Sequence, residues 1–531
     1  PIPNLAIIVK GKNINTVTDS NGNYSLTLPP GINIIESKSI GIKDSSKKVI
    51  IYDNGTLNFS LQESAEMLQE VTIQANRDRN IKEAITGNIQ IKIETIKSIP
   101  LVLGERDILK VATTLPGISN AGEGASGYNV RGGKEDQNLI LLDNGVIYNP
   151  SHFFGIFSAL NPFTIKDVNI YKGTIPAEYG GRLSSVFDIK TKNSNNEKFA
   201  GEVSIGPVTS NIALEIPIIK GASGLLVGAR GTYSDWILKS LDEKSLKNST
   251  ASFYDAVIKY HHKINDNNNL EVTGYYSDDS FSISSDSLYG YNNQLASLKW
   301  SHKFNAKNYG DLSLVNSKYK FNINYNGTSD NNFELGYNIN ETELKLKMKY
   351  LLNEKNSFDY GISSKLYVVN PGNKEPKGSG SIVEPLKIPK EKALESAIFI
   401  SDNYTVNKNI LLNLGFRYSM YSSIGEATQK IYTSGLPKST GTVTDILTCD
   451  KNEVIKTYGG PEIRASLRYF LFNDFSFKAS YNSTYQYIHT LSNNTTASST
   501  DIWKLSDLNI KPQQANQYTL GLYKNIDGNM Y

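Results

Sequence analysis

From Glu202 onward, apolar and polar residues alternate along stretches of ten or more positions. In one stretch three apolar residues alternate with three lysines, Leu344, Leu346 and Met348 with Lys345, Lys347 and Lys349. Similar alternation runs over 315–325 and 410–420. Because successive side chains of a β-strand point to opposite faces, this period of two predicts long strands with one apolar and one polar face. We expect about fourteen such strands, roughly twice as long as those of soluble sandwiches.

The connections between these strands differ in length in an ordered way. Short ones fall at 220–223, 265–269, 305–309, 353–356, 407–409 and 472–474. Long ones fall near 237–250, 279–292, 370–391, 422–458 and 491–511. Transmembrane barrels have tight turns at one end and long loops at the other, whereas a soluble sandwich has no reason to sort its loops. The alternation therefore favours a transmembrane β-barrel over a soluble adhesin built from sandwiches.

Composition agrees with a barrel and excludes other classes. The chain has 531 residues and a formal net charge of +3, which gives no basic face for nucleic acid. Its one cysteine, Cys449, provides neither an internal disulfide nor a metal framework. No window of about 18 apolar residues exists, so no transmembrane helix is predicted. Barrel strands are only half apolar, so a hydrophobic share of 39% is compatible with a barrel.

The first 63 residues carry a different pattern, short β runs separated by turn signals. The runs cover 5–9, 24–28, 32–36, 49–52 and 57–61. The segment TVTDSNGNYSLTLPPG resembles a carboxypeptidase-regulatory-like β-sandwich. The usual opening strand of that sandwich is not found, so we expect a truncated module. A calcium loop through Asp19, Asn21 and Asn23 is rejected, because Gly22 is misplaced and Pro30 stands where the loop needs glutamate.

Residues 127–192 combine turn signals with short apolar runs. Asp143-Asn144-Gly145 separates the runs 139–142 and 146–148. Because Asn-Gly accepts positive φ angles, we expect a hairpin closed by a type I′ turn. Around it we expect a short helix over 106–113, one helical turn over 161–166, a strand over 167–171, a Gly-rich bend at 178–182 and a strand over 185–191.

Four motifs of this module resemble the plug domain of TonB-dependent outer-membrane receptors. They are VRGG at 130–133, LLDNGV at 141–146, NPFTIKDVNIYKG at 161–173 and EYGGRLSSVFDIKTK at 178–192. The candidate plug-motif residues are Arg131, Gly132, Gly133, Asp143, Asn144, Gly145, Glu178, Tyr179, Gly180 and Arg182. The four charged members either pair with charges of the barrel and anchor the plug, or are solvated turn residues. The sequence leaves both interpretations open.

The resemblance implies a mostly β protein in four parts. They are a carboxypeptidase-regulatory-like β-sandwich at 1–63, a linker at 64–95, a small α+β plug at 96–192 and a large antiparallel transmembrane β-barrel at 193–531. Plugged outer-membrane transporters close a barrel of about 22 strands. With about fourteen strands here, we expect the C-terminal part of the barrel to lie beyond this sequence.

The linker holds one candidate docking strand in otherwise polar surroundings. It consists of Glu70, Val71, Thr72, Ile73, Gln74 and Ala75. Alternating residues of β character suit pairing with the edge of another protein's sheet. The segment resembles a TonB box, the motif through which TonB grips these receptors. A strand that leaves the first module is the alternative interpretation.

The resemblance implies an outer-membrane receptor of Gram-negative bacteria that binds a scarce extracellular solute and imports it into the periplasm. TonB, with its inner-membrane energising complex, would displace part of the plug. The implied partners are therefore TonB, outer-membrane lipids and an unidentified extracellular ligand. The alternative is a non-transporting barrel, a receptor or a scaffold for surface lipoproteins or protein-assembly machinery.

No catalytic, cofactor or metal site is predicted, and neither is enzyme activity. The pattern G-x-G-x-x-G at 122–127 lacks a preceding strand and a following helix, so dinucleotide binding is rejected. His261 and His262 are neighbours in a predicted strand near a short turn. Adjacent strand residues point to opposite faces, so this pair cannot hold one metal ion together.

Overall fold

A computed structural model of the chain describes residues 2, 5–12, 14–39, 42–61, 79–92, 107–121, 127–153, 155–233, 236, 240, 249–282, 286–327, 330–491 and 501–524. Two compact units make up the chain, Pro1–Asn80 and Ile81–Tyr531. In the described part of the chain, no helix has both the length and the apolar character that a membrane crossing needs.

The first unit contains a four-stranded antiparallel sheet in the order β2-β1-β3-β4. Its strands are β1 (Ala6–Val9), β2 (Asn15–Val17), β3 (Gly31–Ser39) and β4 (Ile42–Ile51). The predicted runs 24–28 and 57–61 are not strands, but their apolar residues pack on the core around Ile7 and Ile35. Alternation in those two runs reflects burial of one side and not backbone pairing.

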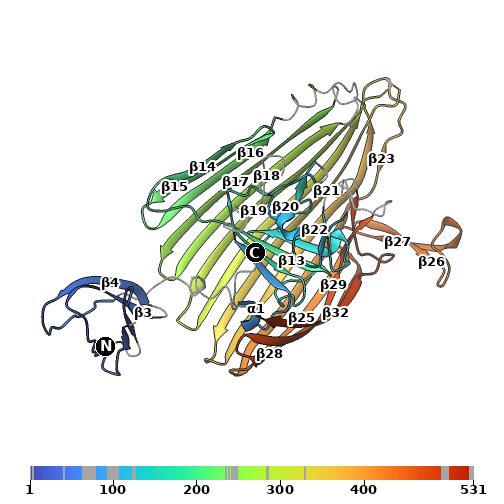
Figure 1. Ribbon diagram of the computed structural model, residues 1–531. Coiled ribbons are helices and arrows are strands. Elements are labelled where there is room, and N and C mark those ends of the chain that lie inside the picture. The colour runs from blue at the N-terminus through green and yellow to red at the C-terminus, as the bar shows by residue number, and fades with distance from the viewer. Residues whose placement is uncertain are drawn as a thin grey trace. The chain divides into compact units, whose positions relative to one another are not determined.

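The second unit is dominated by a sheet of 15 strands, called the wall below, in which all strands but β23 (Leu386–Lys387) follow one path (Figure 1). Along that path each strand pairs antiparallel with the next. The strands are β14 (Ala200–Ile205), β15 (Thr209–Ile219), β16 (Ser223–Thr232), β17 (Thr250–Asn265), β18 (Asn268–Ser282), β19 (Ser287–Lys303), β20 (Asn308–Tyr325), β21 (Phe333–Leu351), β22 (Asn356–Pro376), β24 (Glu391–Asn407), β25 (Ile410–Ile424), β28 (Val454–Phe472), β29 (Phe475–Gln486) and β32 (Gln513–Lys524). The predicted strand number and antiparallel order are confirmed.

The six predicted short connections are short, and four of the five predicted long connections are long. The predicted long loop over 279–292 is wrong, because β18 continues to Ser282 and β19 already begins at Ser287. Asp279 pairs with Tyr291 in this stretch, so neighbouring strands impose pairing on residues of weak strand propensity. Two long connections contain hairpins, β26 (Ala427–Tyr432) with β27 (Val443–Cys449) and β30 (Ile488–Leu491) with β31 (Ile502–Leu505).

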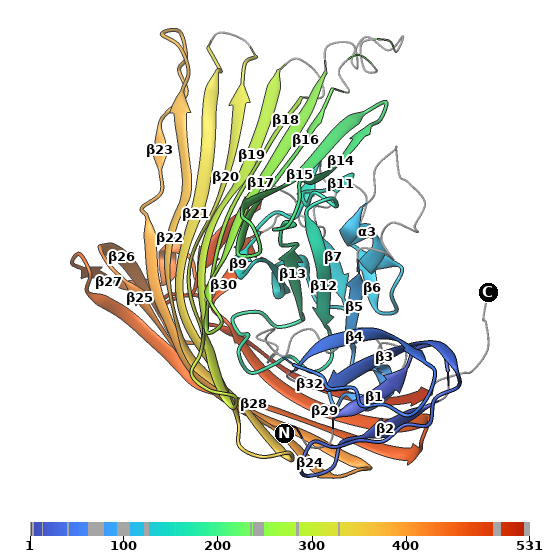
Figure 2. The ribbon, with the colours of Figure 1, turned by 90° about the vertical axis from the view of Figure 1, so that its left-hand side faces the viewer.

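A five-stranded sheet forms the centre of the segment 81–192, called the plug below. Its order is β5 (Asn88–Lys92), β12 (Ile165–Tyr171), β13 (Ser185–Thr191), β8 (Asn138–Leu142) and β9 (Gly145–Val146). Only the β13–β8 pair is parallel. The wall curls around this sheet (Figure 2), and wall residues Val257, Tyr275 and Leu295 join the plug's apolar core.

Smaller elements complete the plug. They are α3 (Ile108–Thr113), β6 (Ile118–Asn120), β7 (Tyr128–Val130), the 3-10 turn η1 (Glu135–Gln137), β10 (Ser151–His152) and β11 (Phe157–Ser158). Helix α1 (Arg79–Lys82) covers the boundary between the two units, and its last two residues begin the plug. A second 3-10 turn, η2 (Thr440–Thr442), lies in the wall's β26–β27 connection. Helix α3 is capped by Asp107, whose carboxylate accepts hydrogen bonds from Leu109 N and Lys110 N.

The predicted helical turn over 161–166 is wrong. Asn161 closes a turn by accepting from Thr164 N, and strand β12 then begins at Ile165.

Candidate functional site

The bend Glu178–Arg182 lies against the polar inner face of the wall. Glu178 Oε1 is 2.6 Å from Lys347 Nζ, and Glu178 Oε2 is 3.2 Å from Lys345 Nζ. On the same strand β21 the side chain of Leu344 is 51% exposed on the outer face. The predicted separation of this strand into an apolar and a polar face is confirmed for these residues, with the lysines inward and Leu344 outward.

The electrostatics of this contact hold Glu178 in its charged form. Burial favours a raised pKa for the Glu178 carboxyl, but the ammonium groups of Lys347 and Lys345 outweigh burial and lower that pKa to about 2. Lys345 Nζ also lies 5.0 Å from the centre of the Tyr179 ring, a cation–π contact. One plug carboxylate is therefore clamped by two cations of the wall.

The two glycines of the bend let the plug backbone approach buried charges of the wall. A Cβ on Gly180 would lie 2.5 Å from Arg417 Nε, so no larger residue fits there without movement of the arginine. Gly181 has a φ of +80° and faces the Glu395 carboxylate. Arg417 Nη2 is 3.9 Å from Glu395 Oε1, and Arg417 Nε is 3.6 Å from Glu462 Oε1. The bend thus rests on a buried ionic network.

The predicted type I′ turn exists, but its central residues are not those expected. Asp143 and Asn144 have φ values of 44° and 76°, whereas Gly145 is not in the positive region. Gly145 is needed for space instead, because a Cβ there would lie 2.3 Å from Leu295 Cδ1 and 2.9 Å from Val315 Cγ1. The hairpin tip therefore presses directly on wall strands β19 and β20.

Asp143 joins the plug's own strand to the wall. Its carboxylate accepts hydrogen bonds from Thr191 N at 3.0 Å and from wall residue Thr273 Oγ1 at 2.8 Å. Lys259 Nζ lies 3.6 Å from the same carboxylate. Asn144 Oδ1 accepts from Lys190 Nζ at 3.0 Å. Glu178 and Asp143 thus both contact wall lysines from separate parts of the plug.

The remaining plug-motif residues lie elsewhere. Arg131 and Gly132 have φ values of 51° and 80°, and Arg131 Nη1 donates to Thr519 Oγ1 at 2.9 Å. A Cβ on Gly133 would collide with the Ser184 side chain. Arg182 lies with its guanidinium 5.2 Å from the centre of the Trp503 ring. The candidate TonB box at 70–75 and most of the G-x-G-x-x-G pattern, 122–126, lie outside the described residues.

One buried contact between plug and wall escapes sequence reasoning. The ring of His152 lies between two wall carboxylates, with Nδ1 2.6 Å from Asp279 and Nε2 3.3 Å from Asp255. Burial alone would lower the pKa of His152, but the two carboxylates raise it above its ordinary value. Arg230 also pairs with Asp255 at 2.7 Å. His152 is about a hundred residues or more from Asp255 and Asp279 in sequence, so no local sequence motif predicts their contact.

The predicted orientation of the histidine pair is confirmed. His261 Nδ1 lies 3.4 Å from the hydroxyl of Ser194. Ser194 belongs to the segment that leads from the plug into the wall. His262 points the other way and stacks on Tyr260 with ring centres 6.0 Å apart. Among the residues that the structure describes, no cluster of histidine, cysteine and acidic side chains has a metal-binding arrangement.

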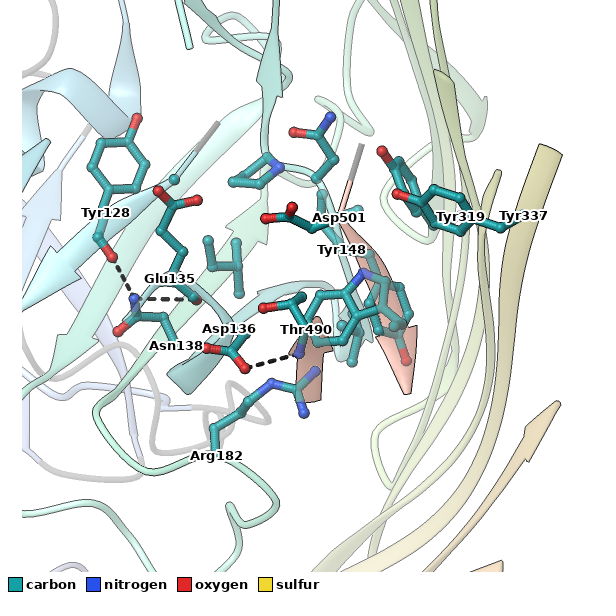
Figure 3. Close-up of a pocket in the computed structure, with 17 residues that line it drawn as sticks. Tyr128, Glu135, Asp136, Asn138, Tyr148, Arg182, Tyr319, Tyr337, Thr490 and Asp501 are labelled. Atoms are coloured by element: carbon teal, nitrogen blue, oxygen red, sulfur yellow. Dashed lines mark hydrogen bonds between the residues drawn. The ribbon is translucent and has the colours of Figure 1, made fainter. Parts of the chain in front are cut away.

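A small cavity of about 60 Å³ lies where plug, wall and the β30–β31 hairpin meet (Figure 3). Its plug side carries Glu135, Asp136, Tyr148 and Arg182; its wall side carries Tyr319 and Tyr337; the hairpin region adds Thr490, Asp501 and Trp503. Tyr148 and Trp503 meet edge to face with ring centres 5.2 Å apart. The cavity is therefore aromatic, charged and built from three separate parts of the fold.

These observations define a class: an antiparallel wall of long strands that curls around an α+β plug held to it by charged side chains. The family model described as "TonB dependent receptor-like, beta-barrel" matches residues 223–530. The model "TonB-dependent Receptor Plug Domain" matches 60–185, and "CarboxypepD_reg-like domain" matches 1–73. The chain belongs to the TonB-dependent receptor-like β-barrel family.

Relatives and solved structures agree with this assignment. TonB-dependent receptor SusC of Bacteroides thetaiotaomicron is 28% identical over 208 residues, which are 37% of this chain and 20% of that receptor. The chain thus matches about a fifth of the length of this curated relative. The ferric preacinetobactin receptor BauA of Acinetobacter baumannii has a similar fold, with a TM-score of 0.55, 12% identity and coverage of 82% and 68% of the two chains.

Two further structures share the fold at similar distance. The copper transporter OprC has a TM-score of 0.60 at 12% identity, and the match covers 83% of this chain and 71% of the OprC chain. The hemophore receptor HasR of Serratia marcescens, solved with its hemophore HasA and heme, has a TM-score of 0.58 at 12% identity, with coverage of 84% and 70%. At such identities the likeness concerns the fold.

Proposed function

We propose that this protein is an energy-coupled importer of the Gram-negative outer membrane, with the wall as its transmembrane part and the plug as its gate. The observation that carries the proposal is the Glu178 contact with Lys345 and Lys347, together with the bend's position on Arg417 and Glu395. Ionic contacts of this kind can be exchanged for water more readily than a continuous apolar interface. The plug also has its own five-stranded sheet, which suits a body that moves.

The two faces of the wall favour a position of this protein in a membrane. Its outer face exposes apolar side chains along successive strands, among them Ile258, Leu314, Leu344, Ile362 and Ile398. Its inner face carries charged side chains that contact the plug, among them Lys259 and Lys345. An apolar exterior and a polar interior are what a barrel in lipid requires.

The energy for gate movement would come from TonB, acting on Glu70–Ala75. This role of the segment rests on its sequence resemblance and on its place before the plug. Strand addition to TonB uses main-chain hydrogen bonds, which any extended segment with free amides offers. No nucleotide is needed at the receptor for such coupling.

Solute depletion by intact cells tests the import function. Gram-negative cells with and without the protein, each with and without TonB, are incubated in a defined mixture of small solutes, and the medium is analysed by mass spectrometry. The proposal expects at least one solute to disappear only when both proteins are present. Equal depletion in all four strains would instead support the scaffold for surface lipoproteins or assembly machinery.

A further inference from the structure

The cavity in Figure 3 contains two buried atoms of opposite polarity that lack hydrogen-bond partners. They are the acceptor Glu135 Oε1 and the donor Arg182 Nε. Arg182 is only 6% exposed, and its Nη1 donates to Gly181 O at 3.0 Å. Buried polar groups in folded proteins are nearly always satisfied, so two orphans lining one cavity point to a molecule that satisfies both.

The third charged plug residue of the cavity is already satisfied by the protein. Asp136 Oδ2 accepts from Thr490 N at 3.0 Å and from Gln486 Nε2 at 3.4 Å. These contacts also fasten the β30–β31 region to the plug. Glu135 and Arg182 therefore remain as the charged plug residues with which a bound molecule would interact.

The surroundings of Glu135 favour a cation. Figure 3 shows the carboxyl groups of Glu135 and Asp501 turned toward one another, with Arg182 lying away from them. Burial, followed by the charges of Asp501 and Asp136, raises the pKa of Glu135 to about 8. Tyr148, Tyr319, Tyr337 and Trp503 add aromatic rings, whose faces attract cations.

We propose that this cavity binds a small zwitterion, an ammonium group joined by a short chain to a carboxylate, as in an amino acid. The ammonium group lies at Glu135 and Asp501, and the carboxylate meets the Arg182 guanidinium. The volume of about 60 Å³ restricts the occupant to a few heavy atoms or to the end of a larger solute. The inference rests on the proposed function, because it names the solute class that the gate would admit.

Equilibrium binding to the purified full chain in detergent tests the solute class without requiring transport. The probes are glycine, β-alanine and γ-aminobutyrate, with propylamine and propionate as singly charged controls, and the readout is tryptophan fluorescence. We expect one zwitterion to bind at least tenfold more tightly than both controls. The signal should vanish in Trp503→Phe and persist in Trp300→Phe, because Trp300 is exposed on the outer face. Equal affinity for propylamine, or no binding by any zwitterion, would overturn the proposal.

Two variants test the ammonium end and the carboxylate end of the bound zwitterion separately. Glu135→Gln should weaken zwitterion binding at least tenfold and abolish the rise in affinity between about pH 7 and 8.5 that ionisation of Glu135 produces. Arg182→Gln should weaken binding similarly but keep that pH dependence, whereas Lys134→Gln, an exposed neighbour, should change neither. An unchanged pH profile in Glu135→Gln would contradict the assignment of the ammonium end.

Binding and import can fail separately. TonB-dependent uptake of some other solute, without zwitterion binding, would overturn this inference and leave the proposed function intact. Zwitterion binding without any TonB-dependent uptake would leave the cavity assignment intact and overturn the proposed function.

Discussion

Glu178 Oε1 lies 2.6 Å from Lys347 Nζ, and this contact joins a bend of the plug to wall strand β21. Removing the negative charge leaves two lysines, Lys345 and Lys347, facing the plug without their counter-ion. We expect Glu178→Gln to lower the free energy of unfolding by about 2 kcal/mol. Urea unfolding of the purified protein measures this change. A loss below about 0.5 kcal/mol, the size typical of solvated surface pairs, would contradict a clamping role.

The same contact predicts a pH dependence. The pKa of Glu178 falls from 4.5 to about 2 in the folded protein, so the carboxylate stabilises the fold fully above about pH 4.5. That contribution fades as the pH falls toward 2, because the folded and unfolded states then bind the same proton. The stability difference between wild type and Glu178→Gln should therefore shrink over this range. A difference that stays constant from pH 6 to about 2.5 would show that Glu178 is not the titrating group.

Gly145 should be intolerant of any side chain because of packing, not because of its φ angle. A methyl group there collides with Leu295 and Val315, so Gly145→Ala should cost about 1–3 kcal/mol. Shortening the neighbour creates room, so Leu295→Ala combined with Gly145→Ala should be less harmful than the sum of the two single changes. Double-mutant unfolding measurements check this coupling. Strict additivity would mean that the hairpin tip does not touch the wall.

The outward face of β21 should be sensitive to charge in a depth-dependent manner. Leu344 is near the middle of the strand, whereas Leu352 lies in the short turn that follows it. Leu344→Arg should cost about 2–4 kcal/mol in lipid, and Leu352→Arg about 0–1 kcal/mol. Unfolding in bilayers provides both values. Equal costs at the two positions would contradict a membrane-spanning wall.

Coupling to TonB should depend on the backbone of the linker segment. Val71→Pro or Ile73→Pro removes a main-chain donor and fixes φ, so either change should abolish uptake, while Val71→Ala should be mild. Solute binding to the purified protein should be unchanged in all three variants. Parallel uptake and binding assays decide the matter. Loss of binding together with uptake would make the segment part of the fold, the alternative interpretation of its sequence.

The arrangement of the wall strands could be predicted because it depends on a local pattern, the alternation of apolar and polar residues. Alternation from Glu202 onward gives the strands, their facing and most connection lengths, and strand β13 has the predicted bounds. The role of Gly145 could not be predicted, since its neighbours Leu295 and Val315 are more than a hundred residues away. The cavity and the His152 contact arise in the same way, from side chains that only the closed fold brings together.

A reversible tether between plug and wall tests the gate. Ala177 precedes the Glu178 bend, and a Cβ on Gly415 of the wall would lie 3.2 Å from Ala177 Cβ, within a few tenths of an ångström of disulfide distance. The control pair is Thr164 with Gly228, whose Cβ positions are 3.6 Å apart beside Lys192, where the plug leads into the wall. Both cysteine pairs are made in a Cys449→Ser background, which removes the natural thiol.

The decisive measurement is TonB-dependent uptake by cells that carry each cysteine pair, before and after reduction of the disulfide. If the Glu178 bend must leave the wall, oxidised Ala177→Cys with Gly415→Cys blocks uptake and reduction restores it. The Thr164→Cys with Gly228→Cys pair should transport in both states, because it joins residues beside the chain's own covalent link. Full uptake through the oxidised Ala177–Gly415 tether would contradict the account.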